Sequence, residues 1–288
     1  MSVIRETVVD ISNGRKKGMK VMVESYGSAM EVVEDCRKRK ITDGFFKNMA
    51  KESMGSWEGV NSYDEALEYL HNGYQPTVDK LKSVANAKIY GTDKRMSFNN
   101  NIIGYAPVVP LAMKGVPNCM IDTQMKPIKT KVIDIYYDVT CSCGTDSETI
   151  IRNGQKVLGA IIELEKQGYR INLYAVQTYA EGMRDVDVLT VKLKSSTQPL
   201  DLRRISFPLT HTAFFRVIGF DWYSKTPKGV YRSGYGCALS YELDTKQTKE
   251  FAKQVWGDNA IYIAGKEIMN HDEEYIKGVF LNETGNVR

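Results

Sequence analysis

The sequence is poor in cysteine and has no long apolar run. Its five cysteines, an odd number without dense spacing, do not form a disulfide framework, and we expect reduced thiols. It lacks the stretch of about 18 apolar residues that a membrane span needs. It also lacks an apolar stretch near its start, as a signal peptide would have. These absences predict a cytoplasmic protein, in the host cytosol if a phage encodes it, that does not engage a membrane.

Several catalytic signatures are missing as well. We find no P-loop, no dinucleotide-binding fingerprint and no nucleophile elbow. Cys141 and Cys143 have one residue between them rather than the usual zinc spacing, and no second Cys or His pair follows. The three histidines are scattered, and His211, between two threonines, favours a capping or core-edge role over catalysis.

Basic residues barely outnumber acidic ones. The net charge of +4, from 39 basic and 35 acidic residues, argues against a protein that coats nucleic acid, although local patches remain open. The densest basic run is Arg37, Lys38, Arg39 and Lys40. Phosphate binding is one interpretation of this run, and a solvated helix face is the other.

The chain divides by pattern into two parts. Hydrophobic residues make up 42% of the sequence, which indicates globular structure. Residues 1–125 form a helix-rich N-terminal region, in which Ser62 and Glu65 have the spacing of a capping box and Gly73 ends the helix. Within it, residues 91–125 are rich in Gly and Pro, which predicts little regular structure, yet they are too apolar for a solvated linker. We expect that segment to pack on a neighbouring surface.

Residues 131–288 show the pattern of an α/β domain. Residues 132–139 form a nearly continuous apolar and aromatic run, suited to a strand buried on both faces. A helix over 147–167 and a strand over 169–176 complete a βαβ unit with parallel strands. Residues 189–193 alternate apolar and polar, which indicates a strand near a sheet edge. Further elements are expected as helices at 209–218, 247–256 and 273–280, and a strand at 260–264.

One candidate site follows the first strand of this domain. Asp138, Thr140 and Ser142 lie where the strand gives way to its helix, and ligand sites of open α/β sheets form outside the carboxyl ends of strands. A carboxylate and two hydroxyls are hard oxygen donors, suited to Mg²⁺, Mn²⁺ or Ca²⁺. The alternative is that Asp138 and Thr140 cap the turn and the helix start.

This part of the chain resembles the opening of a von Willebrand factor A domain. Such domains begin with a buried strand ending in Asp-x-Ser-x-Ser, followed by a helix, a second strand and an antiparallel edge strand. The resemblance implies an A-like (Rossmannoid) fold with a mainly parallel sheet, and a metal site completed by a threonine from a later loop, for which Thr210 or Thr212 would serve. The family's aspartate after a later core strand is missing, because residues 260–263 run into Ala264, Gly265 and Lys266.

The whole chain also resembles an uncharacterised group of phage and mobile-element proteins. The features shared with that group are Ser56-Trp57-x-Gly59, Ser62-x-x-Glu65-Ala66-Leu67 with Gly73, Gly115-x-Pro117-x-Cys119-Met120, and Gly154 with Leu164-x-x-x-Gly168-Tyr169-Arg170. This resemblance implies a phage or prophage setting and carries no established activity.

These observations favour a non-enzymatic module that binds another protein of the host or the phage, assisted by Mg²⁺ or Mn²⁺. Such a module would suit an inhibitor of a host system, a regulator or a virion component, and it could form oligomers. The alternative is a nucleic-acid-binding accessory protein that uses the basic runs. A metal-dependent phosphoesterase comes third, because it needs a second carboxylate near Asp138 that the sequence does not reveal.

Overall fold

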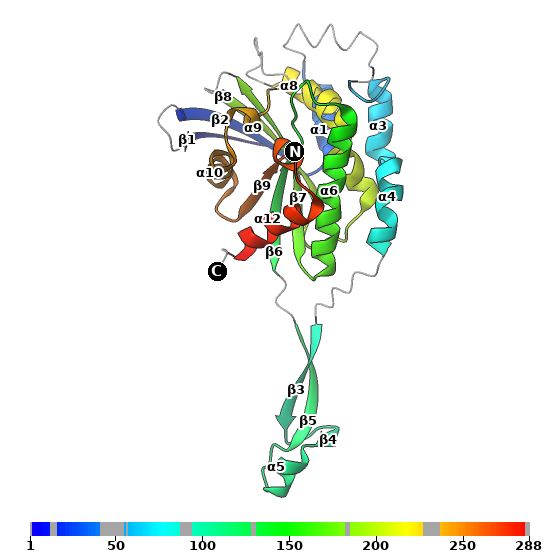
Figure 1. Cartoon of the computed structure of the whole chain (residues 1–288), viewed down its shortest axis with the longest axis vertical. Helices are drawn as coiled ribbons and strands as arrows, with labels where there is room; N and C mark the ends of the chain where they lie inside the picture. The colour runs from blue at the N-terminus through cyan, green and yellow to red at the C-terminus, as the bar shows by residue number, and fades with distance from the viewer. Residues whose placement is uncertain are drawn as a thin grey trace.

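The computed structural model of the chain describes residues 2–11, 16–40, 55, 57–86, 94–127, 131–181, 185–226 and 237–285. They form a head, built on a six-stranded sheet with helices on both faces, and an arm, residues 94–127, that lies apart from it (Figure 1). The head sheet contains β1 (Val3–Ile11), β2 (Lys16–Tyr26), β6 (Val132–Asp138), β7 (Arg170–Glu181), β8 (Asp185–Lys194) and β9 (Ala260–Ala264). Their order is β1-β2-β8-β7-β6-β9, with three of the five pairings parallel.

The predicted βαβ unit is present. Strand β6 pairs in parallel with β7, and α6 (Ser147–Lys166) connects them. Strand β9 pairs in parallel with the other side of β6, so β6 lies inside the sheet, as its apolar sequence predicts. Strand β8 runs antiparallel to β7. The fold is therefore mixed α/β with a mostly parallel sheet.

The prediction that β8 lies near an edge is wrong, because β2 pairs with its other side. The alternation that suggested an edge has another cause. Lys194 is buried and its ammonium lies 2.5 Å from the carboxylate of Glu165, which is buried too, while Thr190 is also buried. The N-terminal region also differs from the helix-rich one expected, since it begins with two strands that extend the head sheet to its outer strand, β1.

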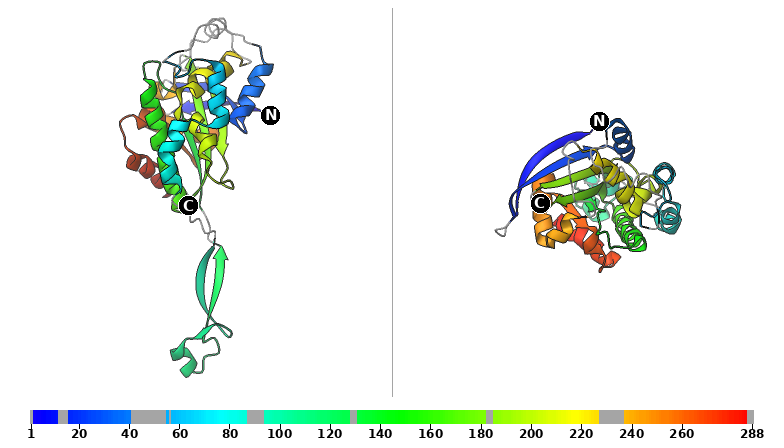
Figure 2. Two further views of the ribbon diagram at one scale, coloured as in Figure 1. Left: turned by 90° about the vertical axis from the view of Figure 1, so that its right-hand side faces the viewer. Right: turned by 90° about the horizontal axis from the view of Figure 1, so that it is seen from above.

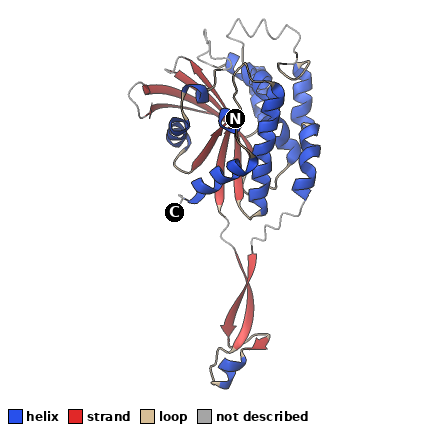
Figure 3. Ribbon diagram, viewed as in Figure 1, coloured by secondary structure: helices blue, strands red, loops and turns tan. Residues whose placement is uncertain are grey.

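Helices cover the two faces of the sheet unequally (Figures 2 and 3). The described residues form two hydrophobic cores, one on each face of the sheet. The larger core includes residues of every described head helix except α9 and α10, which pack on the other face. The helices are α1 (Ala29–Lys38), α3 (Tyr63–Asn72), α4 (Gln75–Asn86), α6, α7 (Leu202–Thr210), the π-helix η1 (Phe214–Gly219), α8 (Phe220–Ser224), α9 (Leu239–Glu242), α10 (Thr245–Trp256), α11 (Gly265–Ile268) and α12 (Glu273–Gly285). Among the described residues, no helix has the length and apolar character that crossing a membrane requires.

Local signals in the sequence placed both ends of α3 correctly. The Ser62 hydroxyl accepts a hydrogen bond from the Glu65 amide at 3.1 Å and so caps α3. The Glu65 carboxylate accepts from the Asn61 amide instead of the Ser62 amide, so the reciprocal half of the capping box is absent. Gly73 ends α3 with φ +83°, and a Cβ there would lie 2.7 Å from the carbonyl oxygen of Arg203. Glycine is therefore required by both conformation and space.

The predicted helix at 209–218 is not continuous. Helix α7 ends at Thr210, His211 follows as its C-cap, and the chain then continues as the π-helix η1. The side-chain amide of Gln177 donates to the Phe214 carbonyl at 3.2 Å. A Cβ at Gly219 would collide with the same Gln177 side chain, so this helix fits its strand only through a glycine.

The arm is a β-hairpin with a folded tip. Strands β3 (Lys94–Asn101) and β5 (Met120–Pro127) pair antiparallel along their full length, β4 (Ala106–Pro107) pairs with β5, and α5 (Val109–Met113) follows. The expectations of sparse structure and of packing on a neighbouring surface are both wrong. Even the three consecutive asparagines, Asn99, Asn100 and Asn101, take part in the ladder with β5.

Candidate functional site

Asp138 is the last residue of β6, and its side chain is fully buried. Its carboxylate accepts hydrogen bonds from the Thr140 amide at 2.9 Å, the Thr178 hydroxyl at 2.7 Å and the Tyr262 hydroxyl at 2.5 Å. Three donors from three segments of the chain thus converge on one carboxylate. A carboxylate removed from water is stable only when it is bonded in this way.

The sheet brings these donors together. Asp138 pairs with Val176 of β7, and Thr178 lies two residues further on the same face. In β9, Tyr262 pairs with Tyr136, which lies on the same face of β6 as Asp138. The Thr140 hydroxyl accepts from the Thr178 amide at 2.9 Å, and the Thr178 hydroxyl accepts from the Leu239 amide at 3.1 Å. The network is closed within the protein.

The electrostatics of this network follow from burial. Burial raises the pKa of Asp138, and the hydrogen bonds from Thr140, Tyr262 and Thr178 oppose this rise without cancelling it. Burial and the neighbouring Asp138 carboxylate raise the pKa of Tyr262 well above its usual value, so its hydroxyl remains a donor. The hydrogen bonds of Asp138 thus connect β6 to β7 and β9 through buried side chains.

The donors of this structure do not fit a divalent cation. Both oxygens of Asp138 already accept hydrogen bonds, and Ser142 accepts from the Gly144 amide at 3.4 Å. Of the threonines proposed to complete the site, Thr210 bonds with Thr77 and Ser206, and Thr212 donates to the Glu58 carbonyl at 2.9 Å. Within the described residues, no three His, Cys, Asp or Glu side chains are grouped as a metal would need. One carboxylate supplies little charge to displace the tightly held water of Mg²⁺.

A positive charge of the protein itself lies beside the loop after β6. The buried guanidinium of Arg216 donates to the Thr145 carbonyl at 2.7 Å and to the Trp57 carbonyl, and it lies 4.4 Å from the centre of the Trp57 ring. The Trp57 indole donates to the Cys143 carbonyl at 2.9 Å. Burial lowers the pKa of Arg216. The loop is thus fixed by an arginine and a tryptophan from other parts of the chain.

Sequence reasoning missed Thr178, Tyr262 and Arg216. A signal existed for Tyr262, because it carries a hydroxyl in a strand that is otherwise apolar, and a buried hydroxyl needs a partner. Thr178 gave no such signal, because β7 holds several other polar residues. Arg216 stands among apolar residues of η1, and a cation in that position is unusual. The partners themselves could not be read from the sequence, because they come from distant segments.

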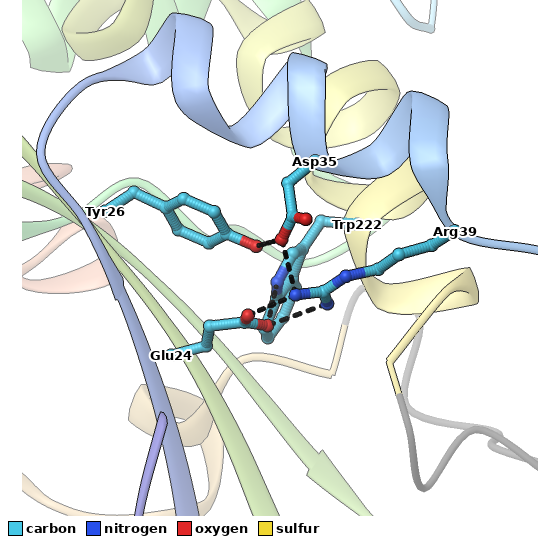
Figure 4. A network of polar contacts seen from close by, with 5 residues as sticks. All are labelled: Glu24, Tyr26, Asp35, Arg39 and Trp222. Atoms are coloured by element: carbon cyan, nitrogen blue, oxygen red, sulfur yellow. Dashed lines mark hydrogen bonds and ion pairs between the residues drawn. The ribbon is translucent and has the colours of Figure 1, made fainter. Parts of the chain in front are cut away.

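The basic run at the end of α1 is only partly available to a ligand. Arg39 donates to both oxygens of the fully buried Glu24 carboxylate and to Asp35 at 2.5 Å (Figure 4). The Trp222 indole donates to Glu24 at 2.8 Å, and the Tyr26 hydroxyl donates to Asp35 at 2.8 Å. The remaining members of the run, Arg37, Lys38 and Lys40, are exposed.

This network links β2, α1 and α8 electrostatically. Burial raises the pKa of Glu24, but the hydrogen bonds from Arg39 and Trp222 outweigh burial, so the pKa lies below its usual value. The Glu24 carboxylate is therefore charged and paired. Arg39 compensates that charge, so its guanidinium is engaged within the protein.

The arm carries the largest group of exposed apolar side chains among the described residues. Its exposed fractions range from 37% to 83% for Phe98, Ile102, Ile103, Tyr105, Val109, Met113 and Val116. Soluble proteins rarely leave large apolar groups together in water unless they form an interaction surface. We call these seven residues the arm patch.

Together, the fold and these features define an α/β protein with a closed carboxylate network at its central strand and an apolar β-arm. The chain belongs to the family described as Domain of unknown function (DUF7192), whose model matches residues 5–282. No curated protein matches the sequence, and no solved structure matches it.

Proposed function

We propose that this protein is a non-enzymatic protein-binding module and that its arm is the element that contacts the partner. The observation that carries the proposal is the arm patch, in which Ile103 is 80% and Met113 is 83% exposed. Exposing such side chains to water is unfavourable, and covering them with a partner recovers that free energy. Methionine and tyrosine are common in interface cores.

We also propose that the head is a von Willebrand A-like domain. The order of β6, α6, β7 and an antiparallel β8 supports this, as does β9 on the other side of β6. Strand β2 is an addition on the outer side of β8. Because the donors around Asp138 do not fit a cation, the binding we propose does not depend on Mg²⁺ or Mn²⁺.

The partner we propose is a protein of the host or of a phage. The whole-length resemblance to phage and mobile-element proteins supports this setting. Residues 94–121 contain three basic residues, Lys94, Arg95 and Lys114, and no acidic residue. A partner surface with an apolar centre and an acidic rim fits this composition best.

A pull-down with matched variants tests the proposal. Ile103→Asp with Met113→Asp places charges in the arm patch without touching the core, and Val132→Asp is the control, because Val132 is 53% exposed on the head. We expect a partner that wild type and Val132→Asp retain and the double variant loses. Equal recovery by all three proteins would contradict the proposal.

Nucleic-acid binding is the second candidate, and the charge of the arm favours it. Residues 94–127 contain four basic residues and one acidic residue, a net charge of +3, while the whole chain has +4, so the rest has +1. If the arm binds DNA or RNA, the affinity must fall steeply with salt, because each neutralised phosphate releases counterions. Fluorescence anisotropy at low salt decides this, and we expect no binding, because the apolar patch lacks the basic groove that tracks a nucleic-acid backbone.

A further inference from the structure

A cavity of about 280 Å³ lies at the carboxyl end of β9. Its wall includes Ala264, the last residue of β9, together with residues of α9, α10, α11 and α12 and of the segments next to them. The arm precedes the amino end of β6, which runs parallel to β9, so the arm and the cavity lie at opposite ends of these strands (Figure 1). A ligand in the cavity is therefore independent of the partner proposed for the arm.

The topology of the head favours a ligand at this place. Strands β7 and β9 lie on opposite sides of β6. Helix α6, which leads to β7, packs in the larger core, and α10, which leads to β9, packs on the other face of the sheet. Open α/β sheets bind ligands outside the carboxyl ends of their strands where the crossovers change face in this way. The cavity lies beside that point, because Ala264 pairs with Asp138 at the end of β6.

The charges of the cavity wall are mixed. Lys266 contributes an ammonium, and Asp244 and Glu267 contribute carboxylates. Phosphate would meet two like charges in this wall, and a divalent cation would meet the ammonium, so both are disfavoured. A ligand without net charge avoids both conflicts.

The donor groups of the wall have hydrogen-bonding capacity left. An ammonium has three N–H groups, and within the described part of the chain that of Lys266 donates to the Ser240 carbonyl at 3.5 Å and forms no ion pair. The Ser240 hydroxyl is buried and has no hydrogen-bond partner among the described residues. Asn270 also lies in the wall, and its side-chain amide can donate and accept. This part of the wall is thus polar and incompletely bonded, which is uncommon in a folded protein.

The acceptor groups of the wall have capacity left as well. One oxygen of Asp244 accepts from the Gln247 amide at 2.8 Å, and one oxygen of Glu267 accepts from the Tyr275 hydroxyl at 3.1 Å. The second oxygen of each carboxylate has no hydrogen-bond partner among the residues that the structure describes. A ligand that matches the wall must therefore donate at some points and accept at others, as a set of hydroxyl groups does.

We propose that this cavity binds a single sugar. A sugar is uncharged, and its hydroxyls donate to Asp244 and Glu267 and accept from Lys266. The rings of His271 and Tyr275, which stack with their centres 3.6 Å apart, offer an aromatic surface to the C–H groups of the sugar. The volume lies just below the range of about 300–1,000 Å³ that is usual for small-molecule pockets, so one sugar unit fits better than a chain of several.

Saturation-transfer NMR with the full chain tests this. The probes are glucose, galactose, mannose, ribose and N-acetylglucosamine, each at millimolar concentration, with inorganic phosphate alongside them. The cavity variants are Lys266→Met and Glu267→Gln, neither of which alters a buried side chain, and circular dichroism checks their fold. Lys253→Met is the matched control, because Lys253 is an exposed lysine of α10 that does not line the cavity.

We expect at least one of these sugars to bind equally to the wild type, to Lys253→Met and to the arm variant Ile103→Asp with Met113→Asp. Each cavity variant should bind that sugar at least about tenfold more weakly, because a hydrogen bond to a charged group is lost. Full binding by either cavity variant, or no binding of any of the five sugars, would overturn the inference. A response to inorganic phosphate and to no sugar would overturn it too.

Discussion

Removing the Asp138 carboxylate should destabilise the head strongly. Asp138→Ala leaves three buried donors without their acceptor, the Thr140 amide and the hydroxyls of Thr178 and Tyr262. Each orphaned buried donor costs about 1–3 kcal/mol, so we expect a loss of about 3–9 kcal/mol in the free energy of unfolding. Asp138→Asn keeps one acceptor oxygen and buries no charge, so its loss should be about 1–2 kcal/mol.

Urea denaturation followed by tryptophan fluorescence measures both variants. A titration with Mg²⁺ should accompany it, because a cation that binds only the folded state raises the melting temperature by mass action. The resemblance to A domains predicts such a rise and the closed network predicts none. The reasoning fails if Asp138→Ala unfolds within about 1 kcal/mol of wild type, or if millimolar Mg²⁺ stabilises wild type and not Asp138→Asn.

The network also sets a direction for the effect of pH. Burial raises the pKa of Asp138 in the folded state above its unfolded value. A folded state that holds its proton more tightly is stabilised at low pH, and this contribution is lost as the pH rises through the folded-state pKa. Asp138→Asn cannot titrate, so the difference in stability between it and wild type should shift in favour of the variant as the pH rises.

Two further changes test other parts of the account. Burial lowers the pKa of His211 to about 4, and its Nδ1 accepts a hydrogen bond from the Ala213 amide at 3.1 Å. The free energy of unfolding should therefore be highest at pH values above the pKa of His211 in the unfolded chain. It should fall by about 2 kcal/mol between pH 7 and pH 5, because the unfolded chain binds the proton more readily. His211→Asn, which can keep the acceptor without titrating, should remove that part of the slope in urea denaturation, and an unchanged slope would contradict the assignment. Arg39→Ala leaves the buried Glu24 carboxylate without its cation and should cost about 3–5 kcal/mol, whereas Arg37→Ala on the exposed face should cost less than about 0.5 kcal/mol. Equal melting temperatures for the two arginine variants would show that the network contributes little.

The βαβ core could be predicted because its signals are local and strong. The apolar run of β6, the helical period of α6 and the strand pattern of β7 each exceed what a loop would show, and a helix long enough to connect two strands predicts a crossover between parallel strands. Ser62 and Gly73 placed the ends of α3 for the same reason, since a cap acts within one turn.

The position of β8 could not be predicted because it depends on a long-range pairing. Nothing in the sequence of β8 shows that β2, more than 150 residues earlier in the chain, pairs with it. The burial of Lys194 depends likewise on Glu165 in α6. In the sequence, a lysine of a buried ion pair cannot be told from an exposed lysine, because its partner lies in another segment.

The arm was misjudged because an apolar segment usually packs within its own chain. Its Gly and Pro residues indicated irregular structure. Strands β3 and β5 nevertheless pair antiparallel, and their sequences show little of the apolar and polar alternation that would predict this pairing. Asp138 lies at the end of β6, as the sequence predicts. Its hydrogen-bond donors Thr178 and Tyr262 lie in strands that follow much later in the chain, so the sequence did not reveal them.

Site-specific photo-crosslinking tests most directly whether the protein contacts its partner through the arm. A photo-reactive phenylalanine analogue replaces Tyr105, which is 66% exposed on the arm, or Tyr241, which is 37% exposed on the head, and cells producing each protein are irradiated. We predict a crosslink from position 105 to another polypeptide chain, either a second copy or a different protein, at several-fold higher yield than from position 241. Crosslinks from position 241 with none from position 105 would contradict the account.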